Sequence, residues 1–145
     1  RAGMRWQTAQ RRMQLAVAAG IAAVPEAVGH LTETLEACRR ERDWFDTWPA
    51  VEAAALRWVR LGEMQPAAVV LGYLDERALG WTPFVGRRRS ANALLAESVE
   101  ATTWRVHGAS LDRDELVDYV LARLKDEDVR SIAGRRVHSA EQPDG

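Results

Sequence analysis

The segment that decides the fold spans residues 44–74 and reads WFDTWPAVEAAALRWVRLGEMQPAAVVLGYL. In its first half, bulky and apolar residues recur every three or four positions: Trp44, Trp48, Val51, Ala55 and Trp58. That spacing is typical of one buried face of an α-helix. Gly62 stops this helix, and Pro66 suits the first turn of a second one. The segment therefore predicts an antiparallel helical hairpin, with Trp58 as a buried anchor.

Four more helices are expected outside this hairpin, near residues 4–19, 25–40, 88–107 and 112–125. The breaks between helices fall near Gly20, Gly62, a loop at Gly80–Gly86, and Gly108. We expect Gly108 to be the left-handed cap of the helix at 88–107. That helix is expected to bury one set of apolar side chains: Ala91, Leu94 or Leu95, Val99 and Val106.

The last helix has the clearest start in the sequence. Asp112 is placed to cap it, and Glu115 follows three residues later, as in a capping box. From Asp126 onward the chain turns polar, without a sustained apolar period. We therefore predict a helical domain at residues 1–125 and a loose polar tail at residues 126–145.

These elements predict an all-α fold of about six helices. Connections between them are short, and short connections favour antiparallel neighbours. The helices therefore form three expected hairpins, at about residues 4–40, 44–80 and 88–125. Gly20, Gly62 and Gly108 recur at intervals of about 42 and 46 residues. The pattern indicates hairpins stacked as a tetratricopeptide-like repeat domain.

Composition excludes several classes of protein. Apolar residues make up 47% of the chain and charged residues 28%, as in globular proteins. The net charge of -1 provides no general attraction to nucleic acid or anionic membranes. The apolar run within residues 11–24 is too short to span a membrane, so no membrane association is expected. Cys38 is the only cysteine, which fits a reducing compartment and a cytoplasmic location.

Residues 58–72 and 104–117 resemble a known family. The first reads WVRLGEMQPAAVVLG and the second WRVHGASLDRDELV. Both resemble the tetratricopeptide-like helical region of large actinobacterial regulators, which join an ATPase core to a LuxR-type DNA-binding domain or a nucleotide cyclase domain. The matching positions in the hairpin are Trp44, Trp48, Leu61, Gly62, Ala67, Ala68 and Gly72. The resemblance implies a scaffold within a signalling or transcription-regulating ATPase.

No catalytic motif of a standard kind occurs in the sequence. A glycine-rich loop ending in Gly-Lys-Ser/Thr is absent, so the ATPase core implied by the resemblance is not in this chain. His30, His107 and His138 belong to different predicted elements, which does not favour a metal site. We therefore expect a non-enzymatic domain without catalytic, cofactor-binding or metal-binding residues.

One cluster of side chains is a candidate binding site. In an antiparallel hairpin the start of the first helix lies beside the end of the second. Aromatic and arginine side chains should therefore meet at one end of the molecule, which we call the aromatic–arginine pole: Trp44, Trp48, Trp81, Phe84, Arg87, Arg88 and Arg89. Aromatic rings beside arginines suit a phosphate-bearing ligand or a partner's acidic segment. The alternative interpretation is an apolar plug surrounded by solvated arginines.

These observations favour a helical-repeat interaction domain that holds a protein partner or other domains of its own polypeptide. Two alternatives remain open. In one, a small effector binds at the aromatic–arginine pole. In the other, the arginines bind nucleic acid, which the net charge does not favour.

Overall fold

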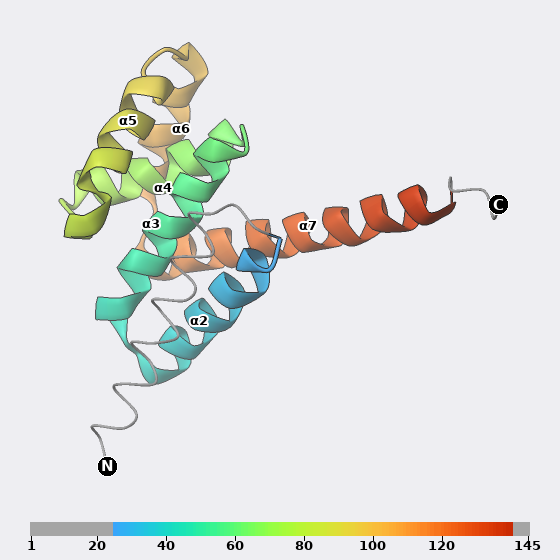
Figure 1. Ribbon diagram of the computed structural model, residues 1–145. Coiled ribbons are helices and arrows are strands. Elements are labelled where there is room, and N and C mark those ends of the chain that lie inside the picture. Colours follow the sequence, from blue (N-terminus) through green and yellow to red (C-terminus); the bar gives the residue numbers. More distant parts are fainter. Residues whose placement is uncertain (1–24, 141–145) are drawn as a thin grey trace.

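Six α-helices and one short 3₁₀ turn make up the computed structural model, which describes residues 25–140 (Figure 1). The elements are α2 (Ala27–Glu41), α3 (Trp44–Arg60), α4 (Met64–Glu76), η1 (Thr82–Phe84), α5 (Val85–Leu95), α6 (Val99–Ser110) and α7 (Arg113–Ala140). No strand occurs in this part of the chain, so the predicted all-α class is confirmed. The helix expected at residues 4–19 and the break at Gly20 lie outside the described residues.

Helix α3 lies at the centre of the molecule and packs against α2, α4, α5 and α7. Its sequence is rich in alanine, which lets neighbouring helices approach closely. Every residue from Pro49 to Trp58 is buried. Trp58 is 2% exposed, which confirms its predicted place in the core. The Trp58 ring and the alanines together explain how α3 can pack against four neighbouring helices.

Three helices end at a residue in the left-handed conformation: α2 at Arg42, α3 at Gly62 and α4 near Ala78. After each, the following amide donates to a carbonyl five residues back, as Glu63 N–H does to Trp58 O at 2.8 Å. The predicted reversal at Gly62 is confirmed. Two of these positions are occupied by Arg42 and Ala78 instead of the usual glycine. The expected end of α4, near Gly80, is therefore too late.

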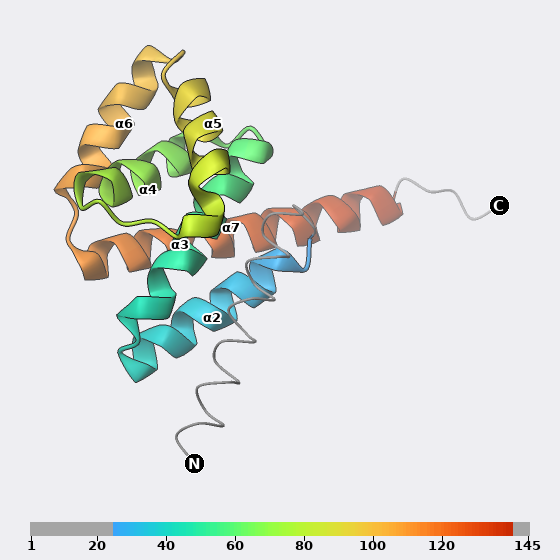
Figure 2. The same ribbon diagram turned by 60° about the vertical axis from the view of Figure 1, so that its left-hand side comes forward.

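The helix expected at residues 88–107 is wrong as a single element. The chain breaks at residues 96–98, and α5 and α6 both lie at the end of the molecule opposite α2 (Figure 2). Ser98 begins α6, and its hydroxyl accepts a hydrogen bond from Ala101 N–H at 3.4 Å. The reversal leaves Val99 88% exposed, and Val106 is exposed too, whereas Ala91 and Leu95 are buried as expected. The expected loop is also shorter, because α5 already begins at Val85.

Helices α4 and α6 touch through their backbones. A Cβ atom added to Gly72 would lie 2.7 Å from Arg105 Cα, and one added to Gly108 would lie 2.6 Å from the Val69 carbonyl carbon. The two contacts show that the helices run antiparallel. Gly108 is therefore not the left-handed cap that we expected: it lies inside α6, where only a hydrogen atom fits.

Helix α7 starts at the predicted capping box. Asp112 N–H donates to Glu115 Oε1 at 3.0 Å, and Glu115 N–H donates to Asp112 Oδ1 at 2.8 Å. The helix continues to Ala140, so the loose tail expected after residue 125 is wrong for residues 126–140. Its far end extends beyond the other helices (Figure 1). Residues 141–145 lie outside the described part.

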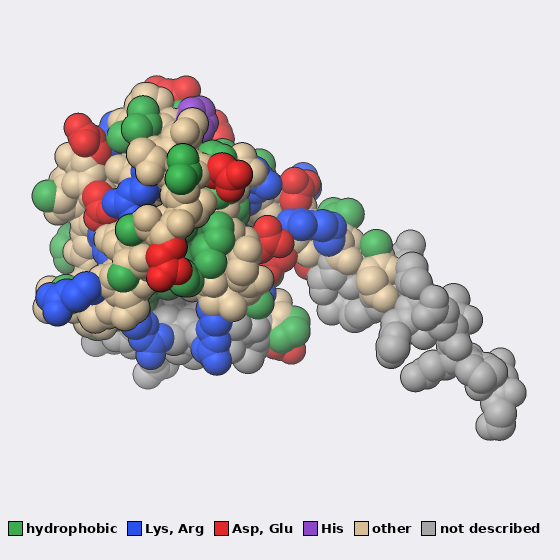
Figure 3. Space-filling view, turned by 90° about the horizontal axis from the view of Figure 1, so that it is seen from above, with side chains coloured by type: hydrophobic (Ala, Val, Ile, Leu, Met, Phe, Trp, Pro, Cys, Tyr) green, Lys and Arg blue, Asp and Glu red, His purple; other side chains and the backbone are tan. Residues whose placement is uncertain are grey.

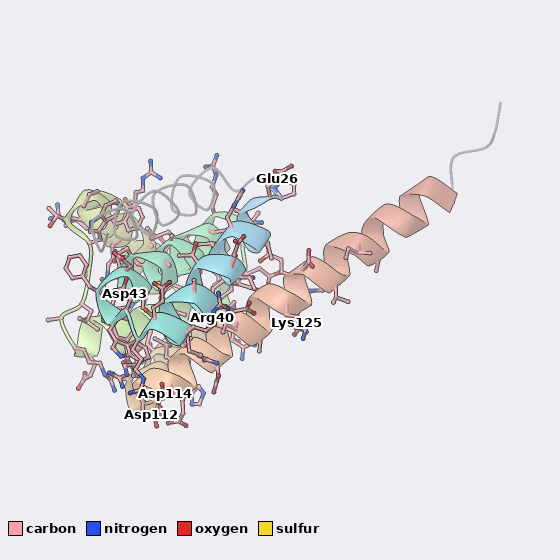
Figure 4. All side chains as sticks on the ribbon, turned by 90° about the horizontal axis from the view of Figure 1, so that it is seen from below. Glu26, Arg40, Asp43, Asp112, Asp114 and Lys125 are labelled. Carbon is pink, nitrogen blue, oxygen red and sulfur yellow. The ribbon has the colours of Figure 1, made fainter. Side chains whose placement is uncertain are left out.

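The last two helices pair with earlier helices rather than chiefly with each other. Helix α6 packs on α4, and α7 packs on α2 and on α4. In Figure 4, Asp112 and Asp114 mark the start of α7 on the same side as Asp43, which precedes α3. Arg113 lies over the Trp44 ring at 3.7 Å and joins these two helix starts. None of the described helices combines the length and apolar character needed to cross a membrane.

Gly108→Ala should destabilise the fold strongly, because the added methyl group would overlap the Val69 backbone. We expect a loss of about 3 kcal/mol or more in the free energy of unfolding, measured by urea denaturation. Gly29→Ala is the matched control, since nothing lies within 4 Å of its added Cβ atom. As a glycine inside α2, it should gain up to about 1 kcal/mol. Equal effects of the two substitutions would contradict the close contact between α4 and α6.

Candidate functional site

The aromatic rings of the predicted pole fall into two groups. In the first, Trp44 stacks on Trp48 with ring centroids 6.0 Å apart, and Trp48 contacts Tyr73 at 5.6 Å. Arg113 covers Trp44, and Arg77 covers Tyr73 at 3.8 Å. Sequence reasoning had named neither arginine, nor Tyr73. The spacing of Tyr73 and Arg77, four residues apart on one helix, is the signal that could have found that pair.

The second group contains Trp81 and Phe84, whose rings meet edge to face at 5.0 Å. Phe84 is buried in the core and Trp81 is half-buried. Among the described residues, no ring contact joins this pair to Trp44 or Trp48. The aromatic residues of the pole therefore do not gather around one cavity.

The three arginines of the pole point to different surroundings. Arg87 and Arg89 are exposed, whereas Arg88 turns inward to the core. Its Nη1 donates to Glu52 Oε2 at 2.7 Å and to the Leu79 carbonyl oxygen. Its Nη2 donates to Asp75 Oδ1 at 2.6 Å. Arg88 thus has a structural role, since two carboxylates hold it, and within residues 25–140 neither Arg87 nor Arg89 forms an ion pair.

Glu52 is the centre of this buried network. Its side chain is 1% exposed, although an ionised carboxylate without partners would be very costly there. Oε2 accepts from Arg88, and Oε1 accepts from the Trp81 backbone N–H at 2.9 Å. Both oxygens are therefore satisfied. The arrangement ties the centre of α3 to the residues that begin η1 and α5.

The network continues to α6 through Asp75. Its Oδ2 accepts a charge-assisted hydrogen bond from Arg105, and Arg105 Nη1 donates to Asn92 Oδ1 at 2.7 Å. Four helices, α3 to α6, are therefore joined by one chain of ionic and polar contacts. Because its members already bind one another, we assign the network to holding α5 in place.

A groove of about 680 Å³ lies between α3 and α5. Five apolar side chains line it: Leu56 and Val59 from α3, Pro83 from η1, and Ala91 and Leu94 from α5. Leu94 is 42% exposed. Arg60 and Arg87 also line this groove, one from each helix. We call it the α3/α5 groove.

The α3/α5 groove differs in charge from three other grooves on the molecule, of about 630, 420 and 380 Å³. Each of those contains acidic side chains: Asp75 and Glu76 in the first, Glu33, Glu36 and Asp128 in the second, and Glu63 and Glu127 in the third. None of the described residues that line the α3/α5 groove is acidic, and two of them are arginines. It therefore combines apolar lining with a positive local charge, which none of the other three does.

The face seen in Figure 3 shows hydrophobic side chains scattered among acidic and basic ones, without one continuous apolar patch. This face therefore offers no broad apolar surface for a partner. In the described part of the chain, no group of three or more His, Cys, Asp or Glu side chains is placed to hold a metal ion. Comparison of the chain with protein-family models, curated proteins and solved structures found no match.

The corner between α2 and α3 holds a carboxyl group with a shifted pKa. Burial, together with Asp43 and Glu41, raises the pKa of Asp46 from 3.8 to about 6. Asp43 caps α3 by accepting from Asp46 N–H at 3.1 Å. Burial also raises the pKa of the Cys38 thiol to about 11, so the thiolate form is disfavoured.

Arg88→Met should cost about 3–5 kcal/mol in the free energy of unfolding, because it leaves Glu52 buried without its cation. Arg89→Met is the matched control: the side chain is exposed, and its loss should change stability by less than about 0.5 kcal/mol. Urea denaturation of both variants measures the difference. Combining Arg88→Met with Glu52→Leu should recover part of the loss, since no buried charge then remains. Equal costs for Arg88 and Arg89 would show that the network does not hold α5.

Asp46→Asn should stabilise the fold at neutral pH. Because the folded pKa is raised, the contribution of Asp46 to stability is fully present below about pH 3.8 and is lost as pH rises through about 6. Asparagine stays neutral, so the variant should gain on the order of 1 kcal/mol at pH 7–8 and nothing near pH 3.5. Urea melts across this range measure the gain. Asp126→Asn, at an exposed position, is the control; a gain for Asp46→Asn that does not depend on pH would contradict the titration.

Proposed function

We propose that this chain is a non-enzymatic interaction domain, which binds a protein partner in the α3/α5 groove. The observation that supports the proposal is the combination of apolar lining and arginines between two helices. Apolar surfaces rimmed by polar groups usually mark interaction sites, and arginine is enriched at binding hot spots. The residues that line the groove, including Leu56, Ala91 and Leu94, suit packing against a partner rather than bond-making chemistry.

The structural support beneath the groove favours this role. Arg88 holds the first turn of α5 against α3 and α4, while Arg87 and Leu94 on the same helix line the groove. The separation of the two walls therefore depends on a satisfied polar network rather than on the ligand. A groove with walls held in this way would not have to be ordered when a partner binds, which lowers the cost of association.

The wider setting follows from the family resemblance and is part of the proposal. In regulators of that kind, a helical interaction domain would couple a partner, or another domain of the same polypeptide, to a nucleotide-binding ATPase core. A cytoplasmic location agrees with this setting and with the single cysteine. The proposal that a small effector binds at the aromatic–arginine pole has less support, because Phe84 and Arg88 are both held in the interior.

The test uses peptides that are selected from a display library for binding to the full chain. Leu94→Asp should lower the affinity for the selected peptides by about tenfold or more, because it places a charge on the apolar wall of the groove. Val99→Asp, which changes a more exposed valine outside the groove, is the control and should leave binding unchanged. Binding is measured by titration calorimetry on variants whose far-ultraviolet circular dichroism matches that of the parent.

Two outcomes would contradict the proposal. Selected peptides that still bind the Leu94→Asp variant would place the interaction surface elsewhere. Equal loss of binding in Leu94→Asp and Val99→Asp would show that the groove has no special role.

A further inference from the structure

We infer that the occupant of the α3/α5 groove is an acidic amphipathic helix of a partner protein, an inference that rests on the proposed function. Three features of the described residues determine this partner: the charge of the groove, the position of Arg87, and the helical nature of both walls. Each feature restricts a different property of the ligand.

The charge of the groove selects an acidic ligand. Among the described residues that line the groove, Arg87 on the α5 wall is an exposed cation, and none is acidic. The chain as a whole carries a net charge of -1, so this positive region is local. A segment seated between the walls would bring one of its edges close to Arg87. Acidic residues on that edge of the segment would be favoured, and lysines there would be repelled.

The position of Arg87 on α5 is unfavourable for a cation. It lies in the first turn of α5, where the helix dipole disfavours a cation, and that turn contains no acidic residue. Arg87 forms no ion pair among residues 25–140, whereas the neighbouring Arg88 is paired with two carboxylates. A carboxylate of the partner beside Arg87 would also face the positive end of α5. The position is therefore complementary to an acidic side chain from outside.

The walls of the groove favour a helical ligand. Both are α-helices, whose backbone groups are bonded within the helices themselves. Addition of a peptide as a β-strand needs a sheet edge, and no strand occurs in the described residues. A helix brings its backbone hydrogen bonds already made. Its apolar side chains can then enter between Leu56 and Leu94, as in other helix-in-groove complexes.

The test uses two synthetic peptides of about 15 residues with the same leucines at positions i, i+3, i+4 and i+7. One carries glutamates beside the leucines, and the other carries lysines. Fluorescence anisotropy with the full chain should show about tenfold or tighter binding of the acidic peptide. Added salt should lower the affinity of the acidic peptide for the chain and reduce its advantage over the basic peptide.

Arg87→Glu should lower the affinity of the acidic peptide about tenfold and raise that of the basic one. Arg89→Glu makes the same change of charge two residues away, outside the groove lining, and should alter either affinity less than about twofold. Leu94→Asp should lower the affinity for the acidic peptide as well. A single-stranded RNA of matched charge serves as the polyanion control and should bind more weakly than the peptide.

The outcomes separate this inference from the proposed function. If both peptides bind equally and both need Leu94, the groove binds a partner but the acidic preference is wrong. If neither peptide binds while display-selected peptides still depend on Leu94, the helical form of the ligand is wrong. If nothing that binds depends on Leu94, the proposed function fails together with the inference. Tighter, Arg87-dependent binding of RNA would replace the protein partner with a nucleic acid.

Discussion

The direct backbone contact between α4 and α6 constrains the rest of the molecule. Gly72 and Gly108 leave no side chain between the two helices, so α6 must lie antiparallel against α4. The break at residues 96–98 is needed to turn the chain back for this contact. Because α6 packs along α4, α7 starts beyond the C-terminal end of α6 and crosses to α2. The order of helix packing therefore follows from two positions where only glycine fits.

The position of α5 has a different physical basis. This helix buries few apolar side chains, chiefly Ala91 and Leu95, and depends on Arg88 for its attachment to α3 and α4. A buried carboxylate such as Glu52 tolerates few arrangements, because each of its oxygens must keep a donor. Ionic contacts thus define the angle of approach where apolar contacts are sparse. The α3/α5 groove exists because α5 is held at its first turn and packs little along its length.

Local signals in the sequence predicted the parts of the fold that depend on local physics. The reversal at Gly62 and the capping box of Asp112 and Glu115 are of this kind, since a few neighbouring residues determine them. Gly108 was misread because a glycine can mark either a helix end or a close helix contact. The distinction needs Val69, which is 39 residues away in the chain.

The candidate site was less predictable for the same reason. Three adjacent arginines look alike in sequence, and only the distant carboxylates of Glu52 and Asp75 separate Arg88 from its neighbours. The groove could not be foreseen either, because its walls are formed by α3 and α5, which were expected in different hairpins. Residues 126–140 show a further limit: this part of the sequence has no sustained apolar period by which to recognise a helix.

The sparse packing of α5 also has a kinetic consequence. Local opening requires the least free energy where few apolar contacts must be broken. For α5, the main event is separation of Arg88 from Glu52 and Asp75, whereas α3 can open only when four neighbouring helices move. Amide protons of α5 should therefore exchange with solvent by local fluctuations, and those of α3 only by global unfolding. Of the two walls of the groove, α5 therefore opens more readily than α3, and the contacts of Arg88 keep it closed in the folded state.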